Sequence, residues 1–254
     1  MLHSRILGDP AGRPVLFLHP GNATGAGWAD LVAELPGIAA ICPDLPGFGR
    51  SAHHPLRDFA DSADLIANLL RAQGVADRVP VVGYSLGGYT GLRLAERHPD
   101  LISGALLTSF QAMPVGGRWW LGPLMTAISP LMTRRFARIR GFRALGLPDG
   151  GSWAPGPVSP CDAATLRRIA QLAFEFDARD DLAGIKTPLL VLSGDREMQS
   201  IRDTVGLVAR EVPNARGAFA PGGHGWPVVR SDLFAATVRA WLAGAALPEE
   251  LVPA

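Results

Sequence analysis

The chain has 254 residues, of which 48% are hydrophobic, and its formal net charge is +1 at pH 7. This composition favours one large α/β domain or two small ones around a packed core, and it argues against disorder. Because the net charge is small and the arginines are spread along the chain, we expect no nucleic-acid partner. The two cysteines, Cys42 and Cys161, make no disulfide framework.

The sequence contains neither a signal pattern nor an apolar run of membrane-spanning length. We therefore expect a cytoplasmic protein without a membrane partner. Its oligomeric state is expected to be a monomer or a homodimer.

Apolar runs alternate with segments of helical spacing over the first 110 residues. Continuous apolar runs are typical of strands that are buried on both faces of a parallel sheet. Strands are expected at residues 2–7, 15–18, 38–42, 81–84 and 102–108, and helices at 28–35, 58–73 and 86–98. This alternation predicts a three-layer α/β/α sandwich with a mostly parallel sheet.

A Gly-x-Ser-x-Gly sequence at residues 83–87 lies between an expected strand and an expected helix. A tight turn of this kind lifts the hydroxyl of Ser85 out of the backbone at the carboxyl edge of the sheet. A side chain at Gly83 or Gly87 would collide with the neighbouring strand or helix. The helix dipole directs its positive end at Ser85, which suits a developing anion, so Ser85 is the candidate nucleophile.

From residue 111 to residue 184 the regular alternation is lost, and glycines and prolines interrupt short helical pieces. We interpret residues 111–184 as an inserted helical cap (lid), and residues 1–110 and 185–247 as the core domain. Alternation resumes with strands at 188–192 and 216–219 and helices at 200–212 and 231–242, and the tail from Pro248 is expected to be frayed.

Several bulky side chains are candidates for a substrate pocket under the cap. They are Tyr84, Met113, Trp119, Trp120 and Trp226. The two adjacent tryptophans can also pack the cap onto the core, since such side chains are more often part of a core than of a ligand platform. In a cap above a cleft both roles can hold.

A serine nucleophile needs a base that takes its proton, and an acid that holds the base, later in the chain. His224 follows the last expected strand, and the glycines around it allow the loop to bend the imidazole inward. The acid is expected after the strand at 188–192, where Asp195 and Glu197 are both available. The residues alone leave both candidates open.

Backbone N–H groups are needed to hold the oxyanion. One is expected from Leu86, and the other from the loop after the strand at 15–18, where Pro20 has no N–H and Gly21 is the expected donor. The loop does not match a dinucleotide-binding or phosphate-binding sequence, and the histidines and carboxylates are not at zinc-ligand spacing. We therefore expect no cofactor and no metal.

Four stretches in this order resemble the α/β-hydrolase fold family, and the resemblance covers nearly the whole chain. They are residues 17–22 (oxyanion loop), 44–51 (a signature turn), 83–88 (nucleophile elbow) and 223–225 (base loop). The resemblance implies a serine-nucleophile, esterase-like branch with a small cap. The family's acid usually stands three residues after the glycine that ends its strand, which favours Glu197 over Asp195. The family usually has glycine where this chain has Pro20.

The expected activity is cofactor-independent hydrolysis of a carboxylic ester, or a related acyl bond, of a small hydrophobic substrate. Ser85, His224 and Glu197 would act through an acyl-enzyme. C–C bond or lactone hydrolysis, acyl transfer and perhydrolysis on the same three residues are alternatives. A slow-turnover, ligand-binding signalling protein and a partner-binding scaffold are alternatives of another class.

Overall fold

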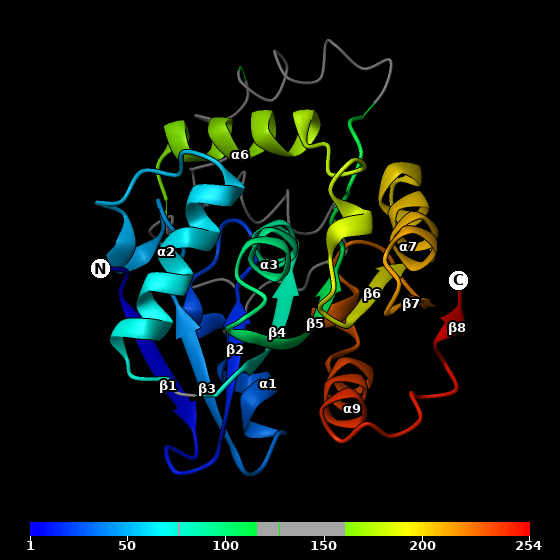
Figure 1. The fold of residues 1–254 in the computed structure, drawn as a ribbon, viewed down its shortest axis with the longest axis horizontal. Helices are drawn as coiled ribbons and strands as arrows, with labels where there is room; N and C mark the ends of the chain where they lie inside the picture. Colours follow the sequence, from blue (N-terminus) through cyan, green and yellow to red (C-terminus); the bar gives the residue numbers. More distant parts are fainter. Residues whose placement is uncertain (76, 116–126, 128–160) are drawn as a thin grey trace.

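The computed structural model describes residues 1–75, 77–115, 127 and 161–254. Its described strands form one eight-stranded sheet in the order β1-β3-β2-β4-β5-β6-β7-β8 (Figure 1). They are β1 (Ser4–Gly8), β2 (Arg13–Leu18), β3 (Ile38–Pro43), β4 (Val79–Tyr84), β5 (Ile102–Thr108), β6 (Leu189–Gly194), β7 (Ala215–Ala220) and β8 (Val252–Pro253). The strands from β3 to β7 pair in parallel, whereas β1 and β8 are antiparallel at the two edges.

Helices cover both faces of the sheet (Figure 1). The described α-helices are α1 (Ala29–Ala33), α2 (Phe59–Ala72), α3 (Leu86–Arg97), α6 (Ala163–Glu175), α7 (Gln199–Glu211), α8 (Trp226–Val229) and α9 (Ser231–Leu242). Short 3₁₀ turns lie at Gly25–Trp28, Gly49–Ser51 and Leu182–Gly184. This arrangement confirms the predicted α/β/α sandwich.

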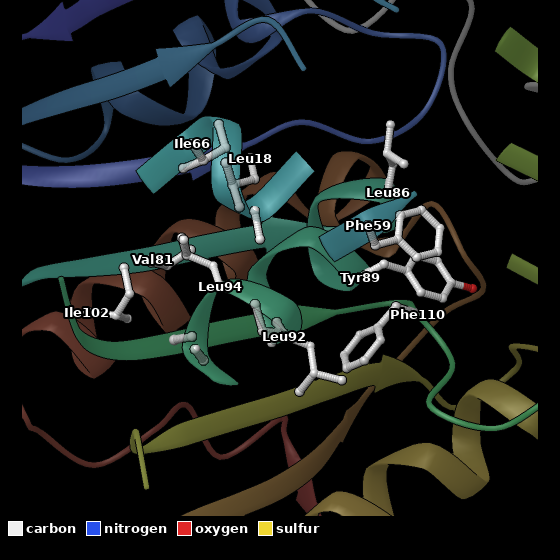
Figure 2. Close-up of a cluster of buried hydrophobic side chains, with 14 of the residues drawn as sticks. Leu18, Phe59, Ile66, Val81, Leu86, Tyr89, Leu92, Leu94, Ile102 and Phe110 are labelled. Atoms are coloured by element: carbon white, nitrogen blue, oxygen red, sulfur yellow. The ribbon is translucent and has the colours of Figure 1, made fainter. Parts of the chain in front are cut away.

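The central strands, β2 to β6, are largely buried on both faces, as their continuous apolar runs predict. Val81 points into a cluster with residues of α2, α3 and α7, whereas Val82 points into a second cluster with residues of α1 and α9. Successive strand side chains alternate between the faces, so each of these central strands contributes to both clusters. Figure 2 shows part of the first cluster, where the rings of Phe59, Tyr89 and Phe110 lie together at one end.

The C-terminal tail differs from its prediction. Residues 252–253 were expected to be frayed, but they form β8, in which Val252 pairs with Phe219 of β7. The N–H of Ala254 also donates to the Gly217 carbonyl oxygen at 3.0 Å. The prediction was wrong because a short polar–apolar tail carries little pattern of its own, and the exposed edge of β7 supplies the hydrogen-bond partners.

Helix α6 is the described helix of the segment expected to be the cap, and it lies over the carboxyl ends of the strands (Figure 1). Residues 112–115 run beside the end of α6 and the residues that follow it, because the Val115 N–H donates to the Phe174 carbonyl and the Ala178 N–H to the Ala112 carbonyl. The boundaries of the cap at 111 and 184 stay a prediction, since residues 116–126 and 128–160 lie outside the described residues.

Candidate active site

Ser85 lies in a strained turn between β4 and α3. Its φ of 53° and ψ of −111° are rare for a residue other than glycine. A Cβ on Gly83 would lie 2.4 Å from the Gly87 carbonyl oxygen, and one on Gly87 would lie 2.0 Å from the Leu18 carbonyl oxygen. The prediction that both positions need glycine is therefore confirmed. The second contact also brings the loop after β2 next to Ser85.

His224 joins Ser85 to Glu197 by two hydrogen bonds. Its Nε2 lies 3.1 Å from Ser85 Oγ, and its Nδ1 lies 2.8 Å from Glu197 Oε2. The three residues come from the carboxyl ends of β4, β6 and β7, which meet at one edge of the parallel sheet. A base with one nitrogen on a hydroxyl and the other on a carboxylate is arranged to take a proton from that hydroxyl.

The Glu197 carboxylate is fully buried and accepts three hydrogen bonds. His224 Nδ1 reaches Oε2, while Ser109 Oγ at 2.7 Å and the Gly194 N–H at 2.9 Å both reach Oε1. Burying a carboxylate is costly unless it is paired and hydrogen-bonded, and these three donors meet that need.

Asp195 is the other acid that the sequence offered, and its side chain points elsewhere. Its Oδ1 accepts from the Gly222 N–H at 2.8 Å, and the Asp195 N–H donates to the Ala220 carbonyl at 2.8 Å. A Cβ on Gly194 would lie 2.3 Å from the Gly222 carbonyl oxygen, so glycine allows the two loops to touch. Asp195 thus fastens the loop that carries His224, whereas Glu197 contacts the imidazole itself.

The loop after β2 is organised around the buried imidazole of His19. Its Nε2 accepts from the Leu45 N–H at 2.9 Å, so its Nδ1 donates to the Pro20 carbonyl oxygen at 2.8 Å. In a trans peptide the carbonyl and the next N–H point in opposite directions, so the Gly21 N–H points away from His19. Burial lowers the pKa of His19 to about 4, although its bond to Pro20 and the nearby Asp44 act in the other direction.

Asp44 holds this loop to the turn after β3. Its Oδ1 accepts from the Gly25 N–H at 2.9 Å and its Oδ2 from the Arg50 N–H at 3.0 Å. Arg5 lies 3.6 Å away as the countercharge. The buried carboxylate therefore fixes both loops at the sheet edge on which Ser85 lies.

Of the side chains expected to line a substrate pocket, two lie in the core and one lies at a pocket. Tyr84 and Trp226 lie in the core, where the Tyr84 hydroxyl donates to the His224 carbonyl and the Trp226 indole N–H donates to Thr108 Oγ1. Met113 is half-buried and lines a pocket with Met198 and other residues at the start of α7. Trp119 and Trp120 lie outside the described residues.

Three contributors to the site were not singled out from the sequence: Ser109, Thr108 and His19. Ser109 and Thr108 stand at the carboxyl end of β5, between the strands that carry Ser85 and Glu197. A polar pair that ends an apolar strand at this edge was the available signal. His19 was placed in the oxyanion loop, but a buried imidazole with two backbone partners leaves no pattern in a sequence.

Among the described residues, no cluster of three or more histidine, cysteine or acidic side chains has the arrangement of a metal site. Within the same residues, every helix is too short or too polar to cross a membrane.

A family model described as "Alpha/beta hydrolase family" matches residues 15–237 of the chain. A relative described as "Putative carbamate hydrolase RutD", from Caulobacter sp. (strain K31), is 27% identical over 96% of this chain and 97% of its own length. A "Pimeloyl-[acyl-carrier protein] methyl ester esterase" from Vibrio campbellii (strain ATCC BAA-1116) is 26% identical over 76% of this chain and 79% of its own.

Among solved structures, an esterase from Exiguobacterium antarcticum superimposes with a TM-score of 0.79 at 18% identity, covering 95% of each chain. At this identity the likeness concerns the fold.

Proposed function

Since the chain belongs to the alpha/beta hydrolase family, we propose that it is a serine hydrolase that cleaves a carboxylic ester of a small, hydrophobic substrate. The observation that carries the proposal is the pair of hydrogen bonds from His224 to Ser85 and to Glu197. Family membership supports hydrolysis, and this geometry supports Ser85 as the nucleophile.

In the proposed mechanism, His224 Nε2 takes the proton of Ser85 as Oγ attacks the substrate carbonyl carbon. The N–H groups of Leu86 and Gly21 hold the oxyanion, and each such donor contributes roughly 10²–10³ in rate. His224 then gives the proton to the leaving alkoxide, which departs as the alcohol. A water molecule, deprotonated by His224, then attacks the acyl carbon. The bond from this carbon to Ser85 Oγ breaks, His224 returns the proton to Oγ, and the carboxylic acid leaves.

The apolar side chains of α6 support the proposal of a hydrophobic substrate. Its apolar side chains Leu166, Ile169 and Leu172 pack on the core while staying half-buried. A Cβ on Gly21 would lie 3.8 Å from Ile169 Cδ1, so the helix lies directly over the proposed oxyanion loop. An acyl chain bound beside Gly21 would therefore meet aliphatic carbon.

The test is covalent labelling with a fluorophosphonate, which reacts with activated serine. We expect the intact wild-type protein to be labelled on Ser85 and Ser85→Ala to remain unlabelled. A panel of p-nitrophenyl esters of increasing acyl length should then show turnover in the wild type and none in Ser85→Ala. A folded wild-type protein that takes up no label and hydrolyses no ester would refute the proposal.

Carbamate cleavage is the second candidate, because a relative that spans almost the whole chain is described as a putative carbamate hydrolase. The same attack on a carbonyl carbon serves a carbamate, in which nitrogen replaces the carbon atom next to the carbonyl group. Matched pairs of an ester and a carbamate with the same alcohol distinguish the two. A higher kcat/KM for the carbamate would favour this candidate over the ester.

A further inference from the structure

A chain of buried hydrogen bonds reaches Glu197 on Oε1, the oxygen that does not face His224. Trp226 Nε1 lies 3.1 Å from Thr108 Oγ1, which lies 3.2 Å from Ser109 Oγ, which lies 2.7 Å from Oε1. Trp226, Thr108 and Ser109 are at most 1% exposed, and the Glu197 side chain is fully buried.

The chemistry of the two end groups fixes the direction of this chain. An indole N–H can only donate, and a carboxylate can only accept. Because the single proton of the Ser109 hydroxyl points to Glu197, the Thr108 hydroxyl donates to Ser109 and accepts from Trp226. Every bond thus runs the same way, and each strengthens the next by polarisation.

The backbone of Ser109 is adapted to this contact. Its φ is 62°, in the left-handed region that residues other than glycine rarely adopt. Its N–H donates to the Leu192 carbonyl of β6 at 3.0 Å, which holds the residue against the strand that leads to Glu197. Backbone strain of this kind persists where the surroundings impose it, and it is frequent at functional sites.

We propose that Ser109 is a positioning residue for Glu197, with Thr108 and Trp226 as the donors behind it; this rests on the proposed function. Ser109 and the Gly194 N–H both bind Oε1, which prevents the carboxylate from turning and reserves Oε2 for His224. The imidazole proton is then held on Nδ1, and Nε2 is free to accept the proton of the nucleophile.

The first test measures kcat and KM for a p-nitrophenyl ester in Ser109→Gly and Ser109→Ala. Both variants remove the hydroxyl, but only glycine relieves the left-handed backbone. Loss of one hydrogen bond to a charged group predicts about a tenfold fall in kcat in both, with KM changed less than about twofold. Thr108→Val keeps the Ser109 hydroxyl and removes the donor behind it, together with the acceptor of the Trp226 N–H. We expect a smaller fall in kcat, about threefold.

The control is Ser193→Ala, on the neighbouring strand β6. The Ser193 hydroxyl is equally buried but donates to the Gly194 carbonyl oxygen at 3.2 Å. We expect its kcat to stay within about twofold of the wild type. Wild-type kcat in Ser109→Gly, or an equal loss in Ser193→Ala, would overturn the inference. If the Ser109 variants fail to fold, Thr108→Val provides the comparison with Ser193→Ala.

The second test needs no turnover. In protein with ¹⁵N-labelled histidine rings, NMR reports which nitrogen of His224 carries the proton. The wild type should show the Nδ1–H tautomer, and Ser109→Gly should show about a tenth or more of the Nε2–H tautomer. An unchanged tautomer in Ser109→Gly overturns the inference even where the wild type binds fluorophosphonate. A changed tautomer supports it even if the wild type binds none, which would refute only the proposed function.

Discussion

The Tyr84 hydroxyl donates a 2.8 Å hydrogen bond to the His224 carbonyl oxygen, across 140 residues of sequence. Tyr84 is the last residue of β4, directly before Ser85, and its side chain lies on the sheet face opposite that of Val81. One strand therefore carries the proposed nucleophile and also supports the backbone of the proposed base. Burial raises the pKa of Tyr84, so its hydroxyl keeps the proton that it donates.

We expect Tyr84→Phe to lower kcat about three- to tenfold without a comparable change in KM, because the ring would stay while the His224 carbonyl loses its donor. The free energy of unfolding should fall by about 1 kcal/mol, as for the loss of a typical buried hydrogen bond. Steady-state kinetics and urea unfolding measure the two effects. A variant with wild-type kcat but lower stability would show that this bond serves the fold alone.

The elbow could be predicted from the sequence because its requirements are local. Gly83 and Gly87 stand within two residues of Ser85, and the steric reason for them is contained in one tight turn. The contact from Ser109 to Glu197 spans 88 residues and depends on the registers of β5 and β6, which no local pattern reports. The order of strands and helices along the chain could also be predicted from the sequence. The pairing of β8 with the edge of β7 could not.

The choice between the two acids gives the next prediction. Glu197→Gln should lower kcat by about 10³- to 10⁴-fold, because an amide can no longer stabilise the imidazolium that forms at His224. Asp195→Asn keeps an oxygen for the Gly222 N–H, so its kcat should fall by less than about fivefold. Each variant replaces a carboxylate by an amide and so loses one negative charge. Steady-state kinetics measures kcat for both. If Asp195→Asn lost most of its kcat and Glu197→Gln lost little, Asp195 and not Glu197 would be the acid that holds His224.

Acid should destabilise the fold through His19. Its pKa is about 4 in the folded protein and about 6.5 in an unfolded chain, so the unfolded chain binds the proton first as the pH falls. The free energy of unfolding therefore decreases between pH 6.5 and pH 4, by about 3 kcal/mol from this group, and its contribution is constant below pH 4. Urea unfolding at a series of pH values measures the slope.

His19→Gln removes the titrating group and should flatten this slope relative to the wild type, while lowering stability at pH 7, where the neutral imidazole is intact. The amide is shorter than the imidazole and cannot reproduce its bonds to Leu45 and Pro20. Identical slopes in the two proteins between pH 4 and pH 6.5 would show that another group causes the acid sensitivity.

Gly87→Ala tests the close approach between α3 and β2. The added Cβ would lie 2.0 Å from the Leu18 carbonyl oxygen, so the helix has to move away from the strand. We expect destabilisation of more than about 3 kcal/mol, as for strong overpacking, or no folded protein. Gly184→Ala is the control, since a Cβ there would have no heavy atom within 4 Å, and its stability should change by less than about 1 kcal/mol. Equal stabilities of the two variants would contradict the close approach.

Ile169 is expected to limit the length of the acyl chain. Its Cδ1 lies 3.8 Å from the position of a Cβ on Gly21, so a substrate whose carbonyl oxygen meets the Gly21 N–H lies close to this side chain. Ile169→Ala removes three carbons and opens an equivalent space for the substrate. Each added methylene that fills it contributes about 0.8 kcal/mol, or roughly fourfold in kcat/KM. The preferred p-nitrophenyl ester should therefore have an acyl chain two or three carbons longer than in the wild type. Gln171→Ala, at an exposed position on the same helix, should keep the wild-type preference.

Loss of a pocket wall changes kcat/KM differently for long and short acyl chains. If Ile169→Ala instead lowers kcat/KM equally for all chain lengths, α6 stabilises the site without selecting the substrate.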